Sequence, residues 1–171
     1  MSTETVEQVT RFKKLVFPED PPASAPVAKR PAELVLHYHA VPARVFDNLC
    51  YSPTYIHDAH QLMHQTRYPS MAITHHYWVP LMLLGWGADP LNSMITGWRS
   101  WDTWVTVNYP EIIITIMADL PNMNLKLLQG PSTHLGVPDG WAMDTFTRLQ
   151  RFYGAAAHRG DGVVIIAELR E

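Results

Sequence analysis

The feature that most constrains this sequence is the near absence of charged side chains from its middle third. Residues 68–125 contain one basic residue, Arg99, and four acidic residues, which are Asp89, Asp102, Glu111 and Asp119. The flanking segments are balanced, because residues 1–67 hold seven bases and seven acids and residues 126–171 hold five of each. The formal charge of −3 therefore lies entirely in the middle. So few charges indicate a segment largely removed from water, by the core or by another protein chain.

The same segment carries most of the tryptophan residues of the chain. Five of the six tryptophans lie in it, at Trp78, Trp86, Trp98, Trp101 and Trp104. Tryptophan, methionine and arginine are enriched at buried contact patches between proteins, whereas lysine and glutamate are depleted there. We therefore expect these tryptophans and Arg99 to form an interface with a neighbouring chain. Burial in the core of the domain is the alternative, and Asp102 or Asp89 is the expected partner of Arg99.

The overall composition excludes several classes of protein. A hydrophobic fraction of 47% with 17% charged residues excludes a disordered polar chain. The acidic balance excludes nucleic-acid binding through general basicity. The single cysteine, Cys50, allows no internal disulfide and fits a reducing compartment, and a core position is the favoured interpretation over a nucleophile. The apolar stretch Tyr77–Ala88 is shorter than the roughly 20 residues of a membrane span, so membrane contact is the less favoured interpretation.

The N-terminal part, residues 1–32, is expected to form a separate arm. Hydrophobic residues at helical spacing predict a helix over residues 4–16, and five prolines between Pro18 and Pro31 predict an extended segment after it. We favour an arm that reaches onto a neighbouring subunit over a mobile linker. The opening residues MSTETVEQ lack the apolar stretch of a secretion signal, so we expect an intracellular or virion location.

Residues 33–171 are expected to form one compact α+β domain, with a mixed or antiparallel sheet flanked by about four helices. Apolar residues that alternate with polar ones or form a continuous run predict strands. A helix-capping residue followed by proline, or apolar residues at helical spacing, predicts a helix. The predicted strands cover residues 33–41, 103–109, 111–119 and 163–169, with a further candidate at 123–129. The predicted helices cover residues 42–49, 53–66, 90–101 and 141–158.

Histidine clusters are the candidate chemical sites of this chain, which has nine histidines. His60 and His64 lie four residues apart in a predicted helix, a spacing that lets two imidazoles share one metal ion. His37 and His39 share one face of a predicted strand, as metal-binding His-x-His pairs do. The favoured alternative is a polar face turned to solvent or, for the strand, to a partner subunit. No complete catalytic motif is present.

These patterns favour a non-catalytic structural or assembly subunit of a larger complex, such as a virion, a phage tail or neck, or an organellar assembly. Such a subunit would bind neighbouring protein subunits, copies of itself or others, through its N-terminal arm and its tryptophan-rich face, and we expect no cofactor. One alternative is a histidine-ligated enzyme, a hydrolase or oxygenase with zinc or iron. Another is a small-molecule-binding domain with an aromatic pocket, built from Trp98, Trp101, Trp104 and Tyr109.

Overall fold

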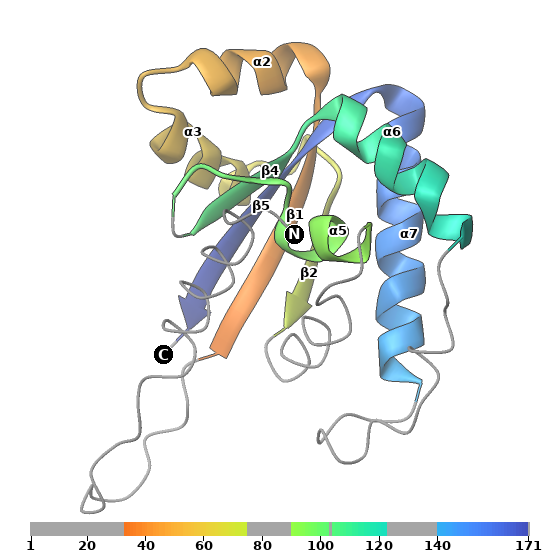
Figure 1. The fold of residues 1–171 in the computed structure, drawn as a ribbon. Helices are drawn as coiled ribbons and strands as arrows, with labels where there is room; N and C mark the ends of the chain where they lie inside the picture. Colours follow the sequence, from red (N-terminus) through yellow and green to blue (C-terminus); the bar gives the residue numbers. More distant parts are fainter. Residues whose placement is uncertain (1–32, 75–89, 103, 123–139, 171) are drawn as a thin grey trace, which may run out of the picture. The chain divides into compact units, whose positions relative to one another are not determined.

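A computed structural model gives the fold of residues 33–74, 90–102, 104–122 and 140–170 (Figure 1). The predictions for the N-terminal helix, for the proline-rich arm and for a strand at residues 123–129 lie outside these residues. Residues 33–170 form one compact unit. Within the described residues, no helix is both long enough and apolar enough to cross a membrane.

The centre of the unit is a five-stranded sheet in which every neighbouring pair of strands is antiparallel. The strand order is β2-β1-β5-β4-β3. The bounds of the strands are β1 Glu33–Pro42, β2 Ser70–Thr74, β3 Arg99–Ser100, β4 Val105–Asn108 and β5 Asp161–Arg170. The expected α+β fold with an antiparallel sheet is thereby confirmed.

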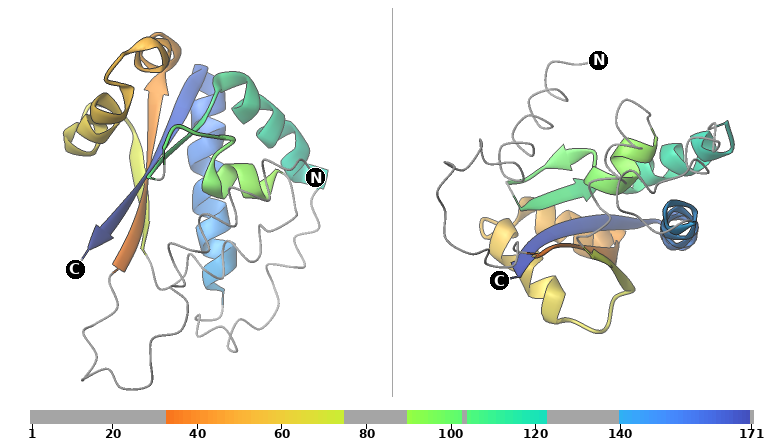
Figure 2. Two further views of the ribbon diagram at one scale, coloured as in Figure 1. Left: turned by 60° about the vertical axis from the view of Figure 1, so that its left-hand side comes forward. Right: turned by 90° about the horizontal axis from the view of Figure 1, so that it is seen from below.

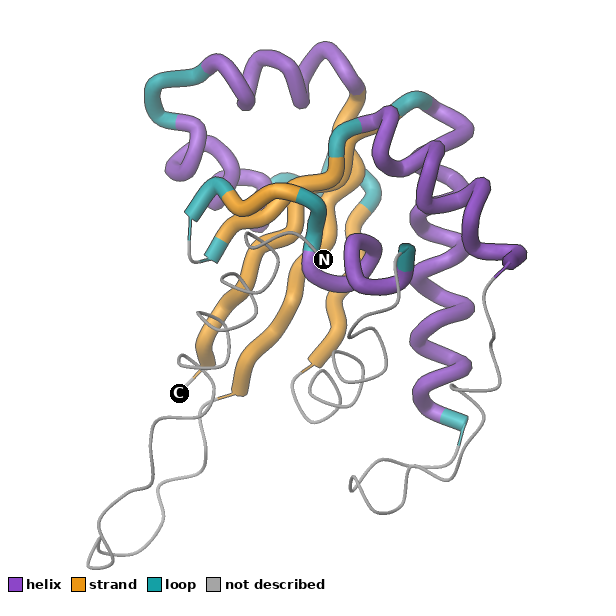
Figure 3. Tube along the Cα trace, in the orientation of Figure 1, coloured by secondary structure: helices purple, strands orange, loops and turns teal. Residues whose placement is uncertain are grey.

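Helices cover both faces of this sheet. Helices α2 and α3 lie on one side of β1 and β5, and helix α7 lies on the other side (Figure 2). Figure 3 shows the same arrangement with helices and strands in different colours. Their bounds are α2 Ala43–Tyr51, α3 Tyr55–Gln61, α5 Leu91–Thr96, α6 Pro110–Asp119 and α7 Trp141–Arg159. Two short 3₁₀ turns, η1 Leu62–His64 and η3 Leu120–Asn122, follow α3 and α6.

The face under α2 and α3 is closed by aromatic packing around Phe46. This side chain is fully buried, and its ring packs against those of Trp101 and Tyr109. Leu49 of α2, Ala59 of α3 and Val164 of β5 belong to the same apolar cluster. The helical pair therefore attaches to the sheet mainly at the end where β1 finishes and β5 begins.

The opposite face is held by a buried polar network. Tyr38 of β1 donates a hydrogen bond from its hydroxyl to the carbonyl of Ile95 at 2.8 Å. Asn108, at the end of β4, donates from its amide to the Ser93 carbonyl and to the Tyr153 hydroxyl, each at 2.8 Å. These bonds connect strands β1 and β4 to helices α5 and α7 across the interior.

One predicted strand is wrong: residues 110–119 form helix α6. Pro110 is the first residue of the helix, a position where proline is favoured because its missing N–H has no partner there anyway. Ile113 and Ile116 face the core at helical spacing, whereas Ile114 is 56% exposed. The run Ile112–Ile114 therefore does not belong to a strand covered on both faces.

Two predicted helices are shorter than expected. The helix expected over residues 90–101 ends at Thr96, because Gly97 adopts a positive φ of 83° and turns the chain into β3. The helix expected over residues 53–66 begins at Tyr55 and ends at Gln61, and it continues only as the turn η1. Helix α7 and strands β1 and β5 agree with their predictions to within about two residues.

Candidate functional site

Strand β1 places two histidines on the sheet face that α2 and α3 partly cover. His37 lies between Ala72 of β2 and Ile166 of β5. His39 lies two residues further along β1 on the same face, between Ser70 and Val164. Side chains two residues apart on a strand point to the same side. The first residues of β1 and the last of β5 extend beyond α2 and α3 (Figure 1), so this end of the face is less covered by the described helices.

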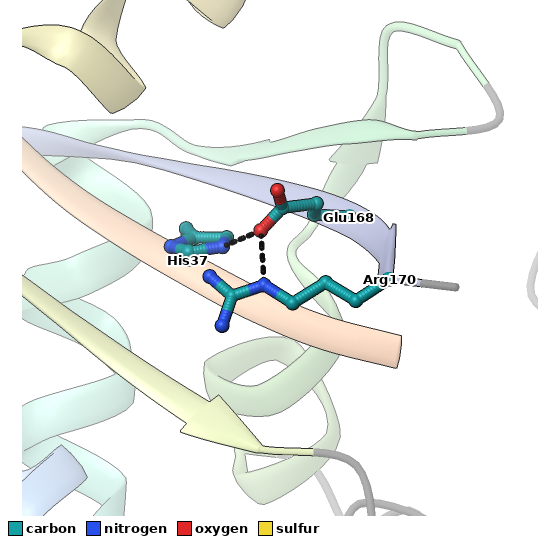
Figure 4. Close-up of polar contacts among 3 residues, drawn as sticks. All are labelled: His37, Glu168 and Arg170. Carbon is teal, nitrogen blue, oxygen red and sulfur yellow. Dashed lines mark hydrogen bonds and ion pairs between the residues drawn. The ribbon is translucent and has the colours of Figure 1, made fainter. Parts of the chain in front are cut away.

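His37 belongs to a short chain of polar contacts that crosses from β1 to β5. Its Nε2 lies 2.8 Å from Oε2 of Glu168, and Nε of Arg170 donates to the same oxygen at 2.9 Å (Figure 4). The hydrogen bond with His37 is the main cause that lowers the pKa of the Glu168 carboxyl, and Arg170 adds to it. The carboxylate is therefore charged at neutral pH and holds the His37 ring in one orientation.

His39 lies deeper than the sequence suggested. We expected this strand face to be turned to solvent or to a partner, but His39 is only 3% exposed. Neither ring nitrogen has a hydrogen-bond partner in the part of the chain that the structure describes. Burial, with a smaller effect from His37, lowers the pKa of His39 to about 4, so its ring is neutral at pH 7.

Replacing His39 with leucine should stabilise the metal-free protein. Two buried nitrogens without partners cost free energy, and an apolar side chain of similar size removes that cost. We expect His39→Leu to raise the free energy of unfolding at pH 7 by about 1 kcal/mol. Urea unfolding in the presence of a chelator measures this, and a destabilised variant would show that the nitrogens are satisfied after all.

The same variant should change how stability depends on pH. A histidine with a folded pKa of about 4 and an unfolded pKa of 6.5 binds its proton more readily in the unfolded state. The wild-type protein should therefore lose stability progressively as the pH falls from 6.5 towards 4, and His39→Leu should lack this part of the loss. Unfolding curves at pH 7, 6 and 5 separate the two slopes.

The other predicted metal pair, His60 and His64, is divided between two elements. His60 is in α3, whereas His64 lies in the turn η1 and is exposed. Within the described residues, no three or more histidine, cysteine, aspartate or glutamate side chains come together as a group that could hold a metal ion. The structure therefore does not join His60 and His64 to His37 and His39 in one shared site.

The predicted interface residues lie mainly at the β3 edge of the sheet. Trp98 is 55% exposed and Arg99 is exposed beside it, whereas Trp101 and Trp104 are half-buried. Trp101 packs against Phe46 and Tyr55, so it supports the core from this edge. Trp78 and Trp86 lie outside the described residues.

The sequence suggested Asp102 or Asp89 as the partner of Arg99, but Arg99 does not pair with Asp102. Its guanidinium donates to the Tyr109 hydroxyl at 3.3 Å. The Asp102 carboxylate instead accepts hydrogen bonds from the backbone N–H groups of Trp104 and Val105, at 2.6 and 2.8 Å. Asp102 thus closes the turn between β3 and β4. Asp89 lies outside the described residues.

Cys50 lies between the core and this edge. The thiol is partly buried, and burial followed by the Asp47 charge raises its pKa. A raised pKa keeps the thiol protonated at neutral pH, and the thiol is a weaker nucleophile than the thiolate. This agrees with the favoured core interpretation of Cys50.

Sequence reasoning missed Glu168 as the partner of His37, and Arg170 as the partner of Glu168. Glu168 lies in the strand predicted over residues 163–169 and Arg170 follows directly after it, but only the register between β1 and β5 brings Glu168 beside His37. A glutamate and an arginine two residues apart at the polar end of an apolar strand were the available signal.

Comparisons with known proteins bear on the fold alone. No protein-family model matches the sequence, and no curated protein matches it. Among solved structures, the fold is similar to that of YfbM from Escherichia coli, a protein described as having unknown function. The TM-score is 0.56 at 14% sequence identity, and the match covers 78% of this chain and 99% of that chain. The likeness supports the α+β architecture.

Proposed function

We propose that this chain is a non-catalytic structural subunit of a larger protein assembly, and that it binds a neighbouring subunit through the β3 edge of its sheet. The observation that carries the proposal is the exposure of Trp98 beside Arg99 at this edge. Tryptophan and arginine are the side chains that most often dominate the binding energy of protein interfaces. Residues 68–125 contain no other basic residue, and depletion of lysine is typical of surfaces that a partner covers.

Hydrogen bonds hold the backbone of Trp98 and the side chain of Arg99, the two proposed anchor residues, in place. The Trp98 backbone N–H donates both to the Val107 carbonyl at 2.9 Å and to Oδ1 of Asn108 at 2.8 Å. Arg99 is held by Tyr109, whose ring packs against Phe46 in the core. Anchors fixed before binding lose little conformational entropy on association, which supports their use as a contact site.

The β3 edge is also suited to selective pairing. It is the last strand of the sheet, and it is only two residues long. Very short edge strands with charged side chains discourage indiscriminate strand pairing. A partner would therefore bind mainly through the Trp98 and Arg99 side chains. The predicted N-terminal arm lies outside the described residues and remains a second proposed contact.

The native mass of the purified full chain tests the proposal. We expect light scattering at micromolar concentration to give a multiple of the 19.5 kDa chain mass. Trp98→Ala and Arg99→Ala should each weaken the association by roughly thirtyfold or more, because truncating a central anchor costs at least about 2 kcal/mol. A monomeric mass for the unaltered chain would contradict the proposal.

Ile114→Ala is the matched control for this experiment. Ile114 is exposed to the same degree as Trp98, at 56%, but it lies on α6 rather than at the β3 edge. We expect its substitution to leave the mass unchanged. If Ile114→Ala and Trp98→Ala weakened the association equally, the chains would be associating non-specifically through exposed apolar groups. That result would count against a defined contact at the β3 edge.

A further inference from the structure

His39 is the most unusual polar side chain in the described residues. It is 97% buried on the covered face of the sheet, and both its ring nitrogens lack a hydrogen-bond partner there. Buried polar groups in folded proteins are nearly always paired, and each exception needs an explanation such as a catalytic role or a bound water or ion. Leaving such a group unpaired costs about 1–3 kcal/mol. An apolar residue at this position would make the folded protein more stable. The presence of a histidine therefore indicates a functional role.

His37, two residues earlier on the same face of the strand, can offer an unprotonated ring nitrogen. The Glu168 carboxylate can only accept hydrogen bonds, so the His37 Nε2 at 2.8 Å must carry the proton. In the neutral ring, Nδ1 is then the unprotonated nitrogen. Histidines that ligate metals almost always donate their other ring N–H to a carboxylate or a carbonyl in this way. Arg170 fixes the carboxylate in turn (Figure 4).

The spacing on β1 allows both rings to reach one ion. Residues two apart on a strand have side chains on the same face and Cα atoms about 6.6–6.8 Å apart. Zinc binds imidazole nitrogen at about 2.0–2.1 Å, so two ligating nitrogens lie within roughly 4 Å of each other. Two imidazole side chains of this length can converge over that separation.

We propose that His37 and His39 together bind a divalent transition-metal ion such as zinc, with Glu168 and Arg170 orienting His37. The pair offers two protein ligands, and the described residues hold no group of three or more that could complete the site. Water or oxygen atoms of a bound molecule would fill the remaining coordination positions. The site lies on the sheet face that α2 and α3 partly cover, separate from the β3 edge, and His39 is its buried ligand.

Zinc binding to the full chain tests this proposal directly. After dialysis against a chelator, titration calorimetry with zinc alone should show one equivalent bound to the wild-type protein. His39→Leu and His37→Gln should each weaken this binding by at least about tenfold, and Glu168→Gln by about 10–100-fold, as for other residues that orient a ligating histidine. Zinc should also shift the ring-nitrogen NMR signals of His37 and His39 but not that of His57.

The double variant His60→Gln/His64→Gln is the matched control, because these residues are the competing zinc pair of the chain. It should bind zinc as the wild-type protein does. Absence of zinc binding by the wild-type chain would overturn the proposal. Binding that His39→Leu retains, and that the double variant loses, would also overturn it and would place the ion at α3 and η1.

Discussion

Replacing Gly162 with alanine should lower the free energy of unfolding by about 3 kcal/mol. Gly162 is in β5 directly under helix α2, where a Cβ atom would lie 2.5 Å from Cγ and 2.7 Å from Cε2 of Phe46. The Phe46 ring is fully buried between Trp101 and Tyr109, so it has little room to move aside. Either β5 or α2 must shift, and the packing of the helical pair on the sheet is lost in part.

Chemical denaturation measures the loss, and Gly154→Ala is its control. Gly154 is in α7, and an added Cβ would meet only the Met117 Cε, at an ordinary contact distance of 3.5 Å. We expect Gly154→Ala to be neutral or to stabilise by about 0.5–1 kcal/mol, because alanine favours helix over glycine. Gly162→Ala should cost less in a Phe46→Leu background than alone, since the smaller side chain relieves the overlap. Equal costs in both backgrounds would contradict this explanation.

The longest elements of the fold could be predicted from the sequence alone. The helix predicted over residues 141–158 and the strands over 33–41 and 163–169 all exist. Their apolar residues repeat at a clear period or extend over most of the element, so the local pattern and the tertiary packing agree. Gly160, which caps α7 with a positive φ of 69°, marks the boundary between helix and strand.

The segment after Pro110 shows where the pattern is ambiguous. Three consecutive isoleucines fit a strand covered on both faces and also fit a helix that packs one side on the core. Tertiary packing decides between them: Ile113 and Ile116 contact the interior, and Ile114 remains exposed. The proline at the first helical position was the available signal for the helix.

The candidate site could be predicted only in part for the same reason. Strand alternation alone puts His37 and His39 on one face. Which face is buried, and whether Glu168 lies beside His37, depends on how β1 pairs with β5. His37 and Glu168 lie 131 residues apart in the sequence. No local pattern specifies that pairing.

Asn108 is the second residue whose substitution should have a large effect, because its side chain connects three elements. It is fully buried at the end of β4. Its Oδ1 accepts from the Trp98 N–H, and its amide donates to the Ser93 carbonyl in α5 and to the Tyr153 hydroxyl in α7. The amide is the one uncharged side-chain group that can both accept and donate twice in this geometry.

Asn108→Asp should therefore destabilise the protein by about 4 kcal/mol at pH 7. The carboxylate keeps the shape of the amide but loses both donors, and it places an unpaired charge in the interior. Burial should raise the pKa of the new carboxyl, so the loss should shrink as the pH falls towards 5.

Asn108→Leu and Tyr153→Phe separate charge from lost hydrogen bonds in this network. Asn108→Leu removes the same hydrogen bonds without adding a charge, so its cost should not depend on pH over that range. Tyr153→Phe removes a single bond and should cost only about 1 kcal/mol. Urea unfolding of the three variants at pH 7 and pH 5 measures these differences. If Asn108→Asp and Asn108→Leu were equally destabilised at both pH values, water would reach the Asn108 side chain and the network would not be a closed one.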